Sequence, residues 1–294
     1  MAKSFENREG WIWYDGKLIP WRDAQTHVVN QGLHYASSVF EGERAYNGKI
    51  FKSEQHTRRL FKSAEIVGIE IPFTQDEINK GKNDLLKKMN LKNCYVRPIV
   101  WRGSNQMGLS TNNADIHVAI AIWDDWASYF KIEDRLDGLK LITSPWKRPS
   151  PDTAPSEAKA SGPYVICTMS KEYAEKKGYH DALMLDYRGY VAEGTGANIF
   201  FIKDKSIHTP IPDCFLNGIT RQTVIEMSKS QGFEITERHI LPEEISKYDE
   251  AFLTGTAAEI TPIRSIDNIN FNTGDNTTTF KFMGDFSNLV SKTS

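Results

Sequence analysis

Three short segments carry residues whose types suggest chemistry: Lys159 in EAKASGPY, Glu193 in VAEGTGANIFF, and FLTGTAAEITPIRS at residues 252–265. A lysine amine that acts as a nucleophile at neutral pH needs burial or a cationic neighbour to lower its pKa. A buried carboxylate favours a protonated nitrogen beside it, because opposite charges attract strongly in a poorly solvated site. Taken singly, these are more often a solvated surface lysine and a turn or cap glutamate. Their meaning therefore depends on whether they occur as a set.

A fourth segment, LNGIT at residues 216–220, predicts an anion site. Gly218, Ile219 and Thr220 start a helix that we expect from Thr220 to Gln231, with Gly232 ending it. Backbone amides at a helix N-terminus have no partner within the helix, and the helix dipole favours an anion there. For this segment alone, an ordinary helix start is the simpler interpretation.

The composition is that of a globular protein with no special partner. Of 294 residues, 39% are hydrophobic and 25% charged, and the net charge of -2 indicates neither nucleic acid nor a membrane surface as partner. The longest apolar run, residues 116–123, is too short to span a bilayer and favours a buried strand. Three cysteines (Cys94, Cys167 and Cys214) show no metal-ligand spacing, so we expect free thiols in the cytoplasm and no metal.

The elements that position these residues form two predicted domains. Turn signals at Asp15-Gly16 and Asn47-Gly48 predict two hairpins, and helical spacing predicts helices near residues 54–67 and 75–89. Strands at residues 94–102 and 117–123 complete a small domain, residues 1–125. A linker at residues 126–138 leads to a larger domain, residues 139–294. In it, we expect a helix near 164–177 and hairpins at 181–194 and 198–209.

In order along the chain, HYASSVFEG, YVRP, the Lys159 segment, EGTGANIF, GIT and GTAAEITP resemble the motifs of fold-type IV pyridoxal-phosphate enzymes, and those of the branched-chain amino acid aminotransferases most closely. The resemblance extends from about Trp11 to Asp267. It implies an α+β fold of two domains, like that of D-amino-acid aminotransferase. The small N-terminal domain would be α/β, and the larger C-terminal domain β-barrel-like with helices.

The resemblance assigns a role to each motif around a pyridoxal 5'-phosphate cofactor, which acts as an electron sink. Lys159 is the catalytic residue that binds the cofactor aldehyde and moves protons, and Glu193 pairs with the pyridinium nitrogen. Arg59, in the motif His56-x-x-Arg59-Leu60, would hold the phosphate through two hydrogen bonds. The remaining implied cofactor contacts are Tyr164 at the ring oxygen and Gly218, Ile219, Thr220, Gly255 and Thr256 at the phosphate.

Substrate recognition is implied in the same way. Tyr95 and Arg97 alternate along one strand and so share a face. Tyr95 would contact the α-carboxylate together with backbone amides of Thr256, Ala257 and Ala258, and Arg97 would bind the second carboxylate of glutamate. Residues at the positions of the family's apolar pocket are equally compatible with an ordinary core. They are Tyr35, Phe40, Gly42, Met107, Leu109, Trp126 and Tyr129.

The implied function is transfer of the amino group of leucine, isoleucine or valine to 2-oxoglutarate by a homodimer or higher homo-oligomer. Two alternatives stay open. One is another fold-type IV enzyme, such as a D-amino-acid or amine transaminase or aminodeoxychorismate lyase. The other is a cofactor-binding protein without catalysis. Four residues depart from the family pattern: Glu43, Leu109, Ala197 and Asn217.

Overall fold

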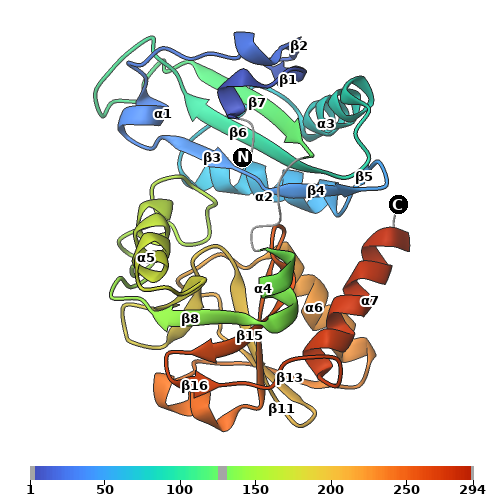
Figure 1. Ribbon diagram of the computed structural model, residues 1–294. Helices are drawn as coiled ribbons and strands as arrows, with labels where there is room; N and C mark the ends of the chain where they lie inside the picture. The colour runs from blue at the N-terminus through green and yellow to red at the C-terminus, as the bar shows by residue number, and fades with distance from the viewer. Residues whose placement is uncertain (1–3, 125–130, 293–294) are drawn as a thin grey trace. The chain divides into compact units, whose positions relative to one another are not determined.

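The structure, a computed structural model, describes residues 4–124 and 131–292. Within these, residues 4–124 with 158–162 form one compact unit, and residues 131–157 with 163–292 form another (Figure 1). The Lys159 segment therefore belongs to the first unit by its contacts, although the sequence assigned it to the domain at 139–294. The predicted linker, residues 126–138, lies partly outside the described residues. Its described part contains helix α4, Ile132–Asp137, which the sequence did not predict.

The first unit is built on a seven-stranded antiparallel sheet. Its order is β2-β1-β7-β6-β4-β5, and β3 also pairs with β6. Both predicted hairpins are confirmed: Asp15-Gly16 and Asn47-Gly48 have positive φ at both positions, as a two-residue turn of this kind requires. The strands are β1 (Trp11–Tyr14), β2 (Lys17–Pro20), β3 (Ser38–Phe40), β4 (Glu43–Tyr46), β5 (Lys49–Ile50), β6 (Cys94–Arg102) and β7 (Ile116–Trp123).

Two helices pack on this sheet, α2 (Ser53–Ile66) and α3 (Gln75–Met89), and both confirm their predictions. Helix α2 buries His56, Leu60 and Ala64, the four-residue spacing from which it was predicted. Helix α3 begins with a capping box in which Thr74 and Glu77 bond each other's backbone amides. The short elements of this unit are η1 (Phe5–Asn7), η2 (Trp21–Asp23) and α1 (Gln31–His34).

The second unit contains a closed barrel. Six strands pair in the order β10-β9-β8-β15-β14-β11, and β10 also pairs with β11, which closes the ring. Each of the six contributes an apolar side chain to one core cluster, so the interior is filled. The prediction of a β-barrel-like domain is confirmed. The strands are β8 (Leu139–Thr143), β9 (Asp181–Leu185), β10 (Val191–Gly194), β11 (Asn198–Lys203), β14 (Glu250–Gly255) and β15 (Glu259–Ile266), with β12 (Ser206–Thr209), β13 (Glu234–Glu237) and β16 (Ile269–Asn270) extending the sheet.

Helices cover this barrel from several sides. Helix α5 (Tyr164–Lys176) packs on β9, and α6 (Ile219–Ser230) packs on β13 and β14. Both were predicted. The sequence did not predict α7 (Thr278–Lys292), which packs on β14 and β15, or η3 (Pro242–Lys247).

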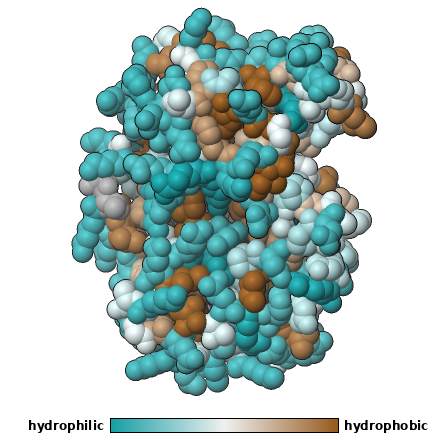
Figure 2. All heavy atoms as spheres, turned by 180° about the vertical axis from the view of Figure 1, so that it is seen from behind, coloured by the Kyte–Doolittle hydropathy of each residue, from teal (hydrophilic) through white to brown (hydrophobic). Residues whose placement is uncertain are grey.

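The outer surface is mixed in character. The face shown in Figure 2 is mostly hydrophilic, with hydrophobic side chains in small groups. Among the helices of residues 4–124 and 131–292, none has the length and apolar character needed to cross a bilayer.

Candidate active site

The backbone of the Lys159 segment is fixed against strand β3 of the first unit. The amide of Phe40 donates to the carbonyl of Lys159 at 3.0 Å, and the amide of Ser161 donates to the carbonyl of Ser38 at 3.0 Å. The amide of Lys159 donates to Ser63 Oγ on helix α2 at 2.9 Å. These bonds fix the backbone from which the lysine side chain projects.

The surroundings of the Lys159 amine favour its neutral form. Burial and then the charge of Arg59 lower the pKa of Lys159 to about 8. Its Nζ lies 4.9 Å from the centroid of the Phe40 ring. At neutral to mildly alkaline pH, such an amine is uncharged far more often than an ordinary lysine, and the uncharged amine is the form that acts as a nucleophile.

Arg59 is held by a carboxylate that the sequence did not indicate. Glu41 Oε1 accepts from Arg59 Nε at 2.6 Å, and Glu41 Oε2 accepts from Arg59 Nη2 at 2.9 Å. The second oxygen also pairs with His56 Nδ1 at 2.7 Å. Burial raises the pKa of Glu41, but the charges of Arg59 and His56 outweigh it and hold that pKa well below its usual range. Glu41 is therefore a buried anion fixed by two residues of helix α2.

Tyr95 and Arg97 lie together on β6, as their alternation predicted. Arg97 Nη2 donates to the Tyr95 hydroxyl at 3.0 Å, and the guanidinium carbon lies 4.8 Å from the centroid of the Phe40 ring. A Cβ atom built on Gly42 would lie 2.1 Å from the Tyr95 hydroxyl, so a side chain at that position would displace the tyrosine. Four predicted residues of the substrate pocket are thus brought together in the first unit.

Two further residues of the predicted pocket, Met107 and Leu109, are exposed in the single chain, as is Tyr35. Trp126 and Tyr129 lie outside the described residues.

Glu43, which departs from the family pattern, has a buried partner. Its carboxylate pairs with Lys82 Nζ at 2.7 Å, and both side chains are fully buried. Lys82 also donates to Thr57 Oγ1 at 2.7 Å. The pairing explains how this chain accommodates a carboxylate at a buried position where apolar residues are common.

In the second unit, Glu193 lies on β10 with two polar partners. Its Oε1 is 3.4 Å from Arg148 Nε, and its Oε2 accepts from Asn198 Nδ2 at 3.3 Å. Glu193 and Asn198 are directly opposed in the β10–β11 pair. Burial removes much of the hydration of this carboxylate, and the guanidinium of Arg148 offsets part of that loss.

Asn198 joins Glu193 to the start of helix α6. Its amide donates to the carbonyl of Leu216 at 3.0 Å, and its carbonyl accepts the amide of Gly218 at 3.1 Å. A Cβ atom on Gly218 would lie 2.3 Å from Asn198 Oδ1, so a side chain there would displace Asn198 from its contacts. Helix α6 begins at Ile219, which places the amides of Ile219 and Thr220 in its first turn. Asn217, where the family has proline, accepts from Arg221 Nη1 at 3.0 Å.

Five further predicted residues belong to the second unit. Thr256, Ala257 and Ala258 form the turn between β14 and β15, as predicted. Gly255 ends β14, and a Cβ atom there would lie 3.5 Å from that of Ala197. Tyr164 is the first residue of helix α5, and its phenol interacts electrostatically with Arg148.

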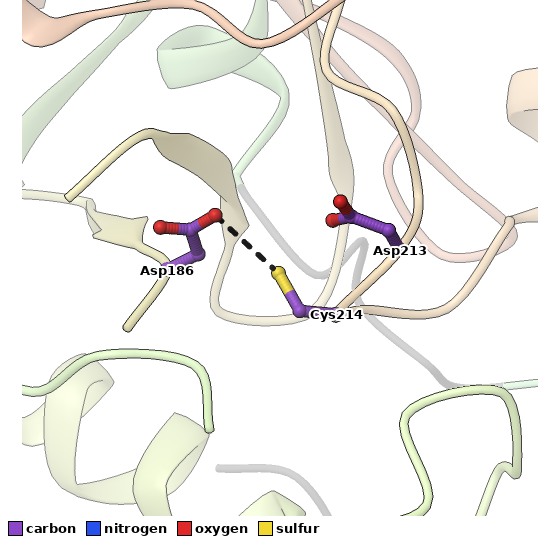
Figure 3. Close-up of side chains that lie close together, drawn as sticks. All are labelled: Asp186, Asp213 and Cys214. Atoms are coloured by element: carbon purple, nitrogen blue, oxygen red, sulfur yellow. Dashed lines mark hydrogen bonds between the residues drawn. The ribbon is translucent and has the colours of Figure 1, made fainter. Parts of the chain in front are cut away.

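Asp186, Asp213 and Cys214 form a cluster of possible metal ligands (Figure 3). Asp186 Oδ1, however, accepts three backbone amides of the β9–β10 turn, and Oδ2 accepts from Arg188. Arg188 also donates to both Asp213 oxygens. The Arg188 guanidinium thus balances the negative charge of both carboxylates. We therefore interpret the cluster as a structural feature that stabilises the β9–β10 turn and not as a metal site.

Three residues that sequence reasoning missed are Glu41, Arg148 and Asn198. No local motif connects these residues to their partners, Arg59 and Glu193, and the sequence-based prediction did not consider which groups must compensate the partners' buried charges. One signal was available for Arg148, because a buried carboxylate such as Glu193 requires a cationic or hydrogen-bonding partner.

Comparisons with known proteins identify the family to which this chain is similar. The amino-transferase class IV family matches residues 38–266. The branched-chain-amino-acid aminotransferase of Pseudomonas aeruginosa is 44% identical over 268 residues, which cover 90% of this chain and 87% of that protein.

Two crystal structures of such enzymes are also similar. That of the Escherichia coli branched-chain amino acid aminotransferase has a TM-score of 0.92 at 34% identity, covering 97% of this chain and 96% of that one. That of the Thermobaculum terrenum branched-chain amino acid aminotransferase, in its PLP-form, has a TM-score of 0.88 at 30% identity, covering 97% and 95%.

Proposed function

The chain belongs to the class IV aminotransferase family, and we propose that it transfers amino groups between branched-chain L-amino acids and 2-oxoglutarate with pyridoxal 5'-phosphate. The predicted family and its fold-type IV architecture are confirmed by these relatives. The observation that carries the proposal is the Lys159 amine, whose pKa of about 8 suits it to nucleophilic and proton-transfer chemistry. A lowered pKa at a buried lysine is typical of a catalytic site and favours an enzyme over a non-catalytic protein.

The residues present fit the cofactor. Pyridoxal phosphate, when bound, supplies an electron sink for the carbanion left when an amino acid loses its α-proton. A side chain at Gly218 would collide with Asn198, and the amides of Ile219 and Thr220 at the start of α6 suit a phosphate. We assign phosphate binding to these residues together with Arg59, Gly255 and Thr256. Tyr164 is assigned to the ring oxygen.

The residues then divide the chemistry. Glu193 holds a proton on the ring nitrogen, because its buried carboxylate favours a cation beside it. Lys159 Nζ accepts the α-proton of the amino acid. Tyr95 and the backbone amides of Thr256, Ala257 and Ala258 bind the α-carboxylate. The substrate side chain is assigned to Tyr35, Phe40, Gly42, Met107, Leu109, Trp126 and Tyr129.

Arg97 separates the two substrate classes. Leucine has one carboxylate, whereas 2-oxoglutarate brings a second one that needs a partner. Loss of an Arg–carboxylate pair costs roughly 2–5 kcal/mol. We therefore expect Arg97→Ala to raise the KM for 2-oxoglutarate steeply and to change the leucine half-reaction much less. Half-reactions measured separately with each substrate test this, and an equal loss for both would mean that Arg97 has only a structural role.

The functional unit in this proposal is at least a homodimer. Four exposed hydrophobic residues lie in two neighbouring segments: Val28 and Leu33 in and just before helix α1, and Met107 and Leu109 in a loop, with Leu109 84% exposed. Gln31 of α1 joins the two segments, because its Nε2 donates to the carbonyls of Gly108 and Ser110. Such apolar surface favours a protein partner, and two-fold symmetry is the commonest arrangement.

We expect sedimentation to give a dimer or larger species at micromolar concentration, and Leu109→Asp to shift it toward the monomer. A monomeric wild-type protein would contradict this part of the proposal. A cytoplasmic location also belongs to the proposal, supported by three buried, free cysteines.

An amino-acid panel tests the function as a whole. The holoenzyme should absorb visible light and convert leucine, isoleucine and valine with 2-oxoglutarate as acceptor. Activity with D-alanine or a simple amine, without any on branched-chain substrates, would assign the chain to another fold-type IV activity. Cofactor binding without turnover of any amino donor would support a non-catalytic protein.

A further inference from the structure

Glu41 is among the most completely buried ionised groups of the first unit. It lies in the short connection between β3 and β4, and its side chain is inaccessible to solvent. A buried carboxylate is unfavourable unless charged partners and hydrogen bonds compensate its lost hydration. Arg59, His56 and the amide of Gly42 provide that compensation. No step assigned to the other residues uses Glu41.

The contact between Glu41 and Arg59 has the geometry of an orienting device. The two oxygens of one carboxylate each accept one N–H from the same edge of the guanidinium. Two parallel bonds of this kind fix both the position and the plane of the group. An arginine side chain otherwise has many rotamers, and ordering it on binding would weaken affinity.

His56 strengthens this arrangement from the same helix. It precedes Arg59 by three residues on α2, and its Nδ1 contacts the Glu41 oxygen that also accepts from Arg59 Nη2. The Glu41 carboxylate therefore contacts two side chains of α2, His56 and Arg59, and Arg59 is the one assigned to the phosphate.

We propose that Glu41 is a positioning residue for the cofactor phosphate: it holds Arg59 in the orientation in which the guanidinium binds that phosphate. The inference rests on the proposed function, because it requires Arg59 to be a phosphate ligand. His56 acts one step further away by holding Glu41. Neither residue needs to touch the substrate.

The neighbouring Glu43 provides a matched control. It follows Glu41 by two residues, is equally buried and is also ion-paired, but its partner is Lys82. Replacing both members of that pair by neutral side chains, E43Q with K82Q, perturbs a similar buried network without removing the contact of Arg59 with Glu41. If burial of charge alone mattered, the two networks would have the same effect on cofactor binding.

The experiment measures the affinity of the apo-protein for pyridoxal phosphate and for pyridoxal, which lacks the phosphate, by visible absorbance. We expect E41Q to weaken pyridoxal phosphate binding by about tenfold to a hundredfold, with much less effect on pyridoxal. E43Q with K82Q should leave both affinities within a factor of about three of wild type, a difference below 1 kcal/mol. E41D keeps the negative charge but has a side chain shorter by one methylene group. Its affinity for pyridoxal phosphate should lie between those of wild type and E41Q.

A double-mutant cycle supplies the decisive comparison. On an R59A background, E41Q should have almost no further effect on pyridoxal phosphate binding, because the residue through which it acts is gone. Equal losses for pyridoxal and pyridoxal phosphate, or an undiminished effect of E41Q without Arg59, would overturn the inference. If E41Q does not fold, E41D replaces it in the test. The same two comparisons are then made: pyridoxal phosphate against pyridoxal, and the wild-type against the R59A background. A wild-type protein that binds no pyridoxal phosphate would instead contradict the proposed function.

Discussion

Lys159→Ala should reduce transamination by a factor on the order of 10⁴ or more, because it removes both the nucleophile and the proton-transfer group. The variant should still bind pyridoxal phosphate through the assigned phosphate contacts, since those come from other residues. Borohydride treatment of the wild-type holoenzyme should fix the cofactor covalently to the peptide that contains Lys159. Peptide mass spectrometry identifies that attachment point.

The pH dependence gives a second test of the same residue. A lysine whose pKa is lowered to about 8 is mostly neutral, and hence nucleophilic, above that pH. The rate at which pyridoxal phosphate attaches to the apo-protein should therefore rise as the pH increases through about 8. Lys62→Ala, at an exposed position of helix α2, should behave as wild type. Attachment to any other lysine, or unchanged turnover by Lys159→Ala, would contradict the assignment.

The sequence predicted those parts of the candidate site that are encoded locally. Lys159, Glu193 and the Gly218 loop each lie in a short motif, and Tyr95 and Arg97 share a strand face that alternation alone predicts. The hairpins were predictable because Asp15-Gly16 and Asn47-Gly48 adopt a backbone conformation that few other residue pairs allow.

What was missed depends on pairings between distant segments. Glu41 contacts Arg59 only because the fold brings the end of β3 next to α2. Glu43 pairs with Lys82, which lies 39 residues further along the chain. Arg148 belongs to a Pro- and Ser-rich loop that resembles any exposed connection, yet it reaches Glu193 on β10. The assignment of the Lys159 segment to the second domain followed sequence order, whereas its backbone bonds tie it to β3. Such contacts are properties of the fold and leave no local pattern.

Glu193→Gln should slow removal of the α-proton by about 10²–10³, the usual cost of losing one preorganised electrostatic partner. Glutamine has nearly the same shape, so the contacts with Arg148 and Asn198 can be partly retained. It has no negative charge, however, and so no longer favours the protonated ring nitrogen. The electron sink becomes shallower while the fold is kept.

Single-turnover measurements with leucine isolate this step, and α-deuterated leucine shows whether proton removal has become rate-limiting. A larger isotope effect in Glu193→Gln than in wild type is expected. Glu250→Gln is the matched control, because Glu250 is equally buried at 8% exposure but caps helix α7 through the amides of Thr278 and Thr279. That variant should lose thermal stability and keep the wild-type rate of proton removal. Wild-type half-reaction rates in Glu193→Gln would show that this carboxylate does not hold the proton on the ring nitrogen.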